Sequence, residues 1–315
     1  MIVVESTKTE EQTLGNTLPV HKSDKLGDKK DAPDVYETPG EFSEGPSKES
    51  CLPAKGDVGS SIARSLIIRN ESPWKYFKEE FSCDLAGPVS LAVHCTSPSR
   101  LLAVRAFSKH NADNVLRIFK RVQHTNIISA GEIFKYNNVL YAVMDDHPLT
   151  LDHLVACEAY PSEVQLASIL AQVIDGLAYL LEAGFEHRAL SCTNVLMGLD
   201  GHIQIAALEH CVKHRFSQSQ TQCLSALTTI TMLLMQKYVK DGDIVGIVDL
   251  KRWSDDSDSI EFLSATTSVV AVEHLKKQPL ITKSGWSPGQ LIGLARLSLI
   301  TTHTFLSDAE HYEHS

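Results

Sequence analysis

The stretch from Pro161 to Gly184 constrains the fold more than any other part of this 315-residue chain. Ser162 and Gln165 form a capping-box pattern directly after the proline, which marks the start of a helix. Apolar residues then recur at helical spacing, namely Leu166, Ile169, Leu170, Val173, Leu177, Leu180 and Leu181. Gly184 stands where a helix commonly ends, so the pattern predicts one long helix with an apolar face.

Upstream of this helix the patterns predict a small β-rich unit that carries a single helix. Apolar runs at 87–94 and 101–107 flank a Ser/Pro turn and read as two strands. Residues 112–122 have the apolar spacing of one helical face. A hairpin is expected from 133 to 144, around the turn Asn137-Asn138.

Downstream of Gly184 the chain is mostly helical. A short hairpin is expected over 194–208, and Leu224–Met235 is apolar nearly all round, as a buried central helix would be. A further helix is expected near 267–277, followed by an amphipathic segment over 288–305. Strands followed by helices indicate an α+β chain.

The first 62 residues differ in composition from the rest. They contain seven lysines and twelve acidic residues, a net charge of −5, and few aromatic residues. Such a segment buries too little apolar surface to offset the entropy of ordering, so we expect a disordered acidic leader.

The whole chain has a formal net charge of −10, which argues against a general binder of nucleic acid or anionic membranes. Its seven cysteines contain no CxxC pair, which is typical of reduced intracellular thiols. The start of the chain does not read as a signal peptide, and the apolar run at 224–235 is too short to span a bilayer. We therefore expect a cytoplasmic or nuclear protein without a membrane span.

The most specific motif follows the long helix. Gly184–Leu196 includes His187-Arg188-Ala189 and Asn194, and is similar to the catalytic loop H-R-D-L-x-x-x-N of eukaryotic protein kinases. Four further segments resemble motifs of that family in the same order: 123–128, 200–205, 261–263 and 273–280. Five motifs in order make the resemblance specific, and the chain is most similar to the PAK-like group of Ser/Thr kinases.

The resemblance implies a bilobal protein kinase-like fold of the α+β class. It places a kinase-like domain at 63–281, after the leader at 1–62. Within this domain a β-rich N-lobe with one helix is expected at 63–145 and a larger helical C-lobe at 146–281. Residues 282–315 would form a helical extension and a polar tail.

The same resemblance implies that the catalytic groups are missing. Phosphoryl transfer needs a base, carboxylates that hold metal and a lysine on the phosphates. These positions fall on Ala189, Ala207 and Arg105, and a methyl group neither accepts a proton nor binds Mg²⁺. The glutamate that pairs with the lysine would fall near Asn114 or Val115, so that ion pair is also absent. No intact catalytic residue and no bound Mg²⁺ are expected.

The segments that hold nucleotide and peptide in the family are altered too. Ser82, Asp84 and Gly87 occupy the glycine-loop positions, and Asp84 would crowd and repel a phosphate. Only fourteen residues separate Ala207 from Gln222, which is too few for a full activation loop. The platform for a peptide substrate is therefore expected to be deleted.

Nucleotide binding stays an alternative. It would use Gly87, Arg105, Met144, Asp146 and Asn194, with Met144 as gatekeeper and an apolar crevice for adenine. Asn194 would either hold metal weakly or cap local backbone groups. Glu209 would either replace a metal ligand or lie exposed in a loop. Arg105 would contact a phosphate or form a surface ion pair.

These patterns predict a catalytically impaired kinase-like protein, a pseudokinase, that acts as a scaffold or allosteric regulator through protein–protein contacts. The expected partners are proteins, with an active kinase or its substrate as one class. Two alternatives are a residual Ser/Thr kinase that uses Arg105, Asn194 and Glu209, and a sensor that binds ATP without metal.

Overall fold

The computed structural model describes residues 66–215, 217–239 and 244–312, with side chains described up to Thr302. The expected leader at 1–62 and the end of the polar tail lie outside the described residues. Residues 61–315 form one compact unit, so the expected boundaries at 145 and 281 stay predictions.

A six-stranded sheet forms the first part of this unit, with the strand order β1-β5-β6-β4-β3-β2. Its strands are β1 (Ile67–Arg69), β2 (Phe77–Asp84), β3 (Pro88–His94), β4 (Leu101–Phe107), β5 (Ala130–Tyr136) and β6 (Val139–Asp145). One helix, α1 (Lys109–Arg121), connects β4 to β5. The β-rich unit with a single helix is confirmed, whereas β1 and β2 were missed.

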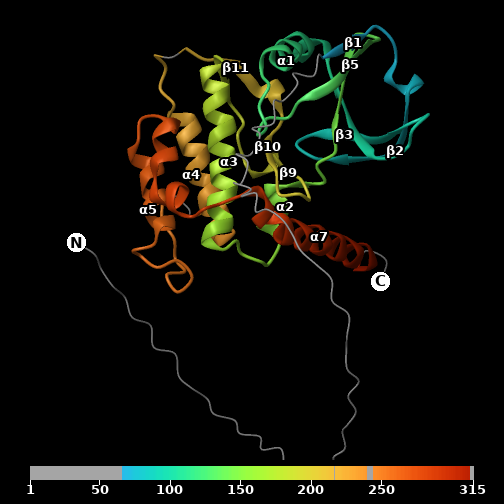
Figure 1. Ribbon diagram of the computed structural model, residues 1–315. Helices are drawn as coiled ribbons and strands as arrows, with labels where there is room; N and C mark the ends of the chain where they lie inside the picture. Colours follow the sequence, from blue (N-terminus) through green and yellow to red (C-terminus); the bar gives the residue numbers. More distant parts are fainter. Residues whose placement is uncertain (1–65, 216, 240–243, 313–315) are drawn as a thin grey trace, which may run out of the picture. The chain divides into compact units, whose positions relative to one another are not determined.

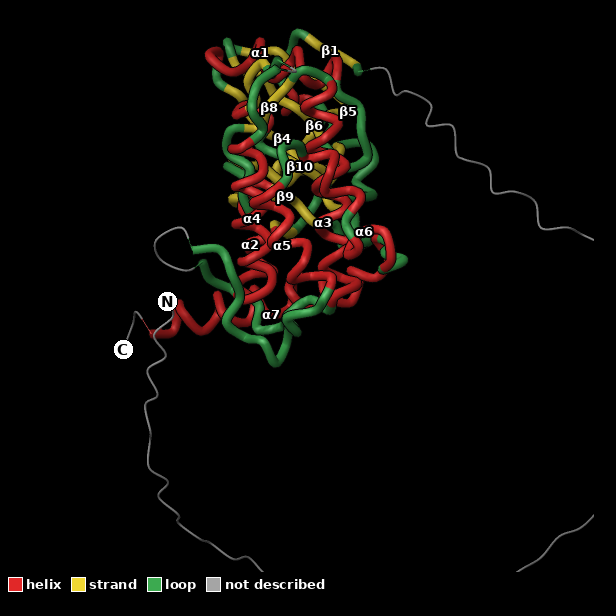
Figure 2. The backbone as a smooth tube through the Cα atoms, turned by 90° about the vertical axis from the view of Figure 1, so that its left-hand side faces the viewer, coloured by secondary structure: helices red, strands yellow, loops and turns green. Residues whose placement is uncertain are grey.

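The second part is mainly helical, as expected (Figures 1 and 2). Its helices are α2 (Leu151–Ala156), α3 (Glu163–Glu182), α4 (Thr221–Gln236), α5 (Asp258–Ser268), α6 (Pro279–Lys283) and α7 (Ile292–Tyr312). Short strands lie between them, namely β7 (Leu149–Thr150), β8 (Phe185–His187), β9 (Val195–Met197), β10 (Ile203–Ile205) and β11 (Cys211–Lys213). This bilobal, mixed architecture is the α+β fold that the sequence predicted.

Helix α3 is the central helix of the second part, and Figure 1 shows it beside α4. The capping box is present, because Ser162 accepts from the backbone N–H of Gln165 while the Gln165 side chain accepts from the backbone N–H of Ser162. Gly184 follows the helix with a positive φ of 83°. By length and composition α3 is the one described helix that could cross a membrane, but 78% of its most apolar window is buried inside the fold. A buried core helix has the same composition.

The prediction of a single helix near 267–277 is wrong. Helix α5 starts earlier, after Ser257, and ends at Ser268. The chain is extended at Ala271 and then forms a separate 3-10 helix at Val272–Lys277. The break is held from outside, since the Gln220 side chain accepts a hydrogen bond of 2.7 Å from the backbone N–H of Val272.

The segment after α6 packs onto the second part. Ser168 on α3 donates to the Ser287 carbonyl at 2.8 Å, and Gln165 donates to the Gln290 carbonyl at 3.2 Å. Gly201 faces the same segment, because a Cβ there would lie 1.9 Å from the Pro288 carbonyl oxygen. Helix α7 follows this tightly packed connection, and its assignment to a separate extension after residue 281 stays a prediction.

A buried polar network joins the turn after α1 to α3 and β10. Asn126 donates to Gln172 at 3.1 Å and to the Ile203 carbonyl at 2.9 Å. Gln172 accepts from the Ile203 backbone N–H at 3.0 Å. Gly176 lies under this network, and a Cβ there would be 2.6 Å from the Asn126 carbonyl oxygen. Glycine at this position lets α3 approach the turn closely.

Replacing Gly176 with alanine is expected to lower the free energy of unfolding by about 1–3 kcal/mol, because the added methyl overpacks the contact with Asn126. Gly293→Ala in α7 is the matched control, since nothing lies within 4 Å of a Cβ at Gly293. The control should be neutral, or stabilising by up to about 1 kcal/mol, because alanine favours helix. Urea unfolding measures both, and equal midpoints for the two variants would contradict the close approach.

Candidate functional site

An ion pair spans the cleft where the sheet meets the second part. Arg105 on β4 and Glu209, in the 3-10 helix after β10, lie 2.6 Å apart between Nη2 and Oε1. Their side chains are only 9% and 13% exposed. Burial lowers the pKa of Arg105, and the carboxylates of Glu209 and Asp84 oppose that effect. An arginine keeps its charge under any ordinary condition, so the pair is ionic.

This contact corrects both earlier interpretations of the two residues. Arg105 is 7% exposed, so it does not form a surface ion pair. Glu209 does not lie exposed in a loop, and its Oε2 is buried without a hydrogen-bond partner. The pair was missed because its members are 104 residues apart and no local pattern connects them.

The turn between β2 and β3 closes over Arg105. The backbone N–H of Gly87 donates to Asp84 Oδ1 at 3.0 Å, so the Asp84 carboxylate stabilises the turn between β2 and β3. Gly87 has a φ of 108°, and a Cβ there would lie 2.3 Å from Arg105 Nη2. The glycine is therefore required by the close approach of the guanidinium group.

Beneath the pair only a small cavity remains, with a volume of about 20 Å³. Its walls include Met144, Asp146, Ala207 and Glu209. A cavity of that size holds about one water molecule, whereas ligand pockets usually measure about 300–1,000 Å³. Burial also raises the pKa of Asp146. The crevice expected for adenine falls at this cavity, and its use by a nucleotide stays a prediction.

Ala207 lies at a sharp turn of the chain, and Ala189 forms a hydrogen bond with a nearby side chain. Ala207 is 2% exposed and adopts the left-handed conformation with φ 53° and ψ 43°. Such a conformation is uncommon for a residue with a Cβ. The Ala189 carbonyl accepts a hydrogen bond of 2.7 Å from the Asn194 side chain. Asn194 therefore uses its amide on the local backbone.

No metal site is formed by these residues. In the parts of the chain that the structure describes, no group of three or more His, Cys, Asp or Glu side chains could hold a metal ion. Asn194 and Glu209, the two candidate ligands, are each engaged with a protein partner, Ala189 and Arg105.

The segment that resembles the catalytic loop is held by internal contacts. His187 is buried, and its Nε2 lies 2.9 Å from the Ala206 carbonyl oxygen. Burial lowers the pKa of His187, and the neutral ring donates to that carbonyl if Nε2 carries the proton.

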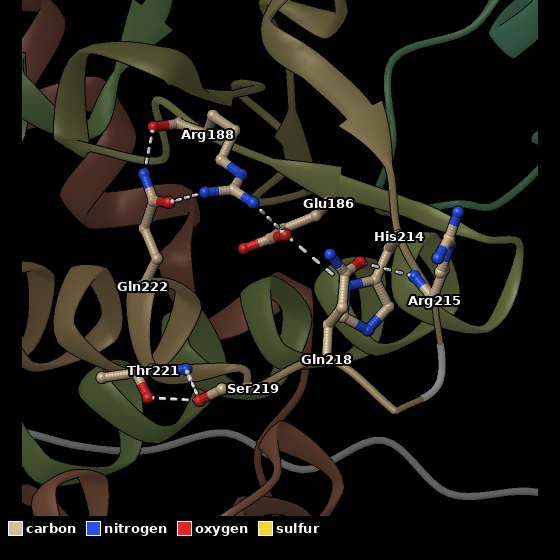
Figure 3. Close-up of polar contacts among 8 residues, drawn as sticks. All are labelled: Glu186, Arg188, His214, Arg215, Gln218, Ser219, Thr221 and Gln222. Atoms are coloured by element: carbon tan, nitrogen blue, oxygen red, sulfur yellow. Dashed lines mark hydrogen bonds and ion pairs between the residues drawn. The ribbon is translucent and has the colours of Figure 1, made fainter.

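Arg188 is held by both strand β8 and helix α4, as Figure 3 shows. Its guanidinium group donates to Gln222 at 2.7 Å and lies 2.9 Å from Glu186. Gln222 donates in return to the Arg188 carbonyl at 2.8 Å. Buried His214 is 3.5 Å from the same Glu186 carboxylate. Glu186 and Gln222 were not predicted as the partners of Arg188.

The segment between Ala207 and α4 is short and folded along the described residues. β11 pairs with β8 in antiparallel register. Asn114 on α1 donates to the Cys211 carbonyl at 2.8 Å. Asn114, one of the two positions to which the resemblance assigns the glutamate of the ion pair, thus connects α1 to β11.

Glu209→Ala is expected to lower the free energy of unfolding by about 3 kcal/mol, since breaking a buried pair leaves Arg105 without a counter-charge. The double replacement of Arg105→Met with Glu209→Leu is the control. It should unfold within about 1 kcal/mol of the native chain, because an apolar pair avoids the desolvation cost. Chemical denaturation measures both, and an unchanged midpoint for Glu209→Ala would show that the pair is solvated.

Comparisons with known proteins agree with this geometry. The family model for the protein kinase domain matches residues 87–231. Three curated Ser/Thr kinases show the degree of similarity. SMU1 of Mycosarcoma maydis is 29% identical over 108 residues, 34% of this chain and 14% of that protein. The shk1/pak1 kinase of Schizosaccharomyces pombe is 30% identical over 101 residues, which are 32% of this chain and 15% of that protein. PLK4 of Drosophila grimshawi is 31% identical over 94 residues, which are 29% of this chain and 12% of that protein.

This chain therefore spans only 12–15% of the length of these three relatives. The matches to these three relatives cover 94–108 residues of this chain. With the sheet, the helical part and the catalytic-loop segment in place, the chain contains a protein kinase-like domain.

Proposed function

We propose that this protein is a pseudokinase that works as a scaffold or an allosteric regulator through protein–protein contacts. The observation that carries the proposal is the buried pair of Arg105 and Glu209, 2.6 Å apart across the cleft. A nucleotide would have to break this pair and expand a cavity of about 20 Å³. Both steps cost free energy that binding would have to supply.

The chemistry that remains in the cleft also opposes phosphoryl transfer. Ala189 and Ala207 offer neither a base nor a metal ligand, and transfer depends on charge stabilisation by such groups. Asp84 adds a carboxylate that interacts electrostatically with Arg105, the position that the resemblance assigns to phosphate contact. Like charges raise the cost of bringing in a triphosphate.

The finer assignments follow from the same proposal. We place the chain with the PAK-like group on its motifs, and one similar relative is the shk1/pak1 kinase. We propose a cytoplasmic or nuclear location, protein partners such as an active kinase or its substrate, and no required ATP or Mg²⁺. The rivals are a metal-free nucleotide sensor and a residual kinase.

The thermal stability of the full chain should stay unchanged when ATP is added, with or without Mg²⁺. A ligand that binds only the folded state at a hundred times its dissociation constant would stabilise it by about 2.7 kcal/mol. An active protein kinase measured under the same conditions is the positive control.

Two results would overturn the proposal. Stabilisation by ATP alone would favour the nucleotide sensor. Stabilisation that needs Mg²⁺, together with radiolabelled phosphate transfer that Glu209→Ala abolishes, would establish a residual kinase.

A further inference from the structure

Helix α1 and strand β11 place three cations around one buried aromatic ring. The guanidinium carbons of Arg117 and Arg121 lie 5.6 Å and 5.4 Å from the ring centre of Phe185. Lys213 is the register partner of Phe185 in the antiparallel pair of β11 and β8. Opposed residues in such a pair point to the same face, so Lys213 lies on the same face of the two strands as Phe185. We call Arg117, Arg121 and Lys213 the α1–β11 cluster.

The cluster is held in place by contacts on its inner side. Asn114 donates to the Cys211 carbonyl and accepts from Arg117 Nη2 at 2.6 Å. Arg121 donates to the Ala183 carbonyl at 3.4 Å. The stacking on Phe185 and these bonds restrict the side chains before any ligand arrives, which reduces the entropy lost on binding.

The cluster has no carboxylate partner among the residues that the structure describes. None of its three members forms an ion pair within the described ranges of the chain, whereas Arg105 and Arg188 both do. The nearby Glu186 is buried and occupied by Arg188. Arg117 Nε is buried and has no hydrogen-bond partner among the described residues. Arg121 and Lys213 are exposed, so an added acceptor can reach their donor groups.

We propose that the α1–β11 cluster is the docking surface for an acidic segment of a partner protein. Carboxylates match the planar donor groups of arginine and pair with them in two-point contacts. Val212, 41% exposed, is the register partner of Glu186 and lies on the other face of β11, so the cations alone make the proposed contact. The inference rests on the proposed function, because it names the surface through which the protein would bind its partner.

The charge of the molecule favours a short acidic segment over nucleic acid. The chain has a net charge of −10, and a long polyanion would meet that repulsion beyond the cluster. A short peptide touches only the local cations, which lie within a Debye length of it.

The probe is a short fluorescein-labelled peptide of alternating glutamate and serine, titrated with the full chain at low salt and followed by anisotropy. Arg121→Glu combined with Lys213→Glu should weaken binding by about tenfold or more, because two attractions become repulsions. Lys135→Glu, an exposed unpaired lysine on β5, is the matched control and should change affinity by less than about twofold.

Three results would overturn the proposal: no binding by the native chain, an equal loss in the Lys135→Glu control, or tighter binding of an oligonucleotide of the same charge. Arg121→Gln with Lys213→Gln gives a second test if charge reversal prevents folding, which urea unfolding would show. Stabilisation of the native chain by ATP would count against the pseudokinase function alone, since peptide binding does not depend on the cleft.

Discussion

The contact between Arg105 and Glu209 decides what the cleft of this protein can do. It fixes strand β4 of the sheet to the segment after β10 through two nearly buried charges. Because the guanidinium group lies against Gly87, the same contact shapes the turn between β2 and β3. The remaining cavity has room for about one water molecule. A position that the kinase resemblance assigns to phosphate contact therefore serves the fold.

The segment around Ala189 and Ala207 is held by contacts that also support the fold. His187 contacts the Ala206 carbonyl, and Asn194 supports the Ala189 carbonyl. Arg188 joins β8 to α4 through Gln222. None of these contacts uses the side chain of Ala189, so they do not depend on which residue stands at that position. These contacts hold the kinase-like fold together whatever chemistry the cleft performs.

The parts of the fold that sequence patterns predicted are those with strong local signals. Helix α3 has a capping box, a regular apolar face and a terminal glycine, and its limits agree closely with the expected ones. Strand β2 was missed because six of its eight residues are exposed and its apolar alternation is weak. Helix α5 was displaced because Gln220, far away in sequence, holds the break at Val272. The missing aspartates were visible in the sequence, whereas the partner of Arg105 depended on a tertiary contact.

The most direct measurement of the closed cleft is the nuclear magnetic resonance of the Arg105 guanidinium group in the isotope-labelled full chain. A buried ion pair slows rotation of the group and protects its protons from exchange with water. The account predicts separate, slowly exchanging Arg105 signals that disappear in Arg105→Lys and do not move when ATP is added. A single averaged signal, or a saturable shift on addition of ATP, would contradict it.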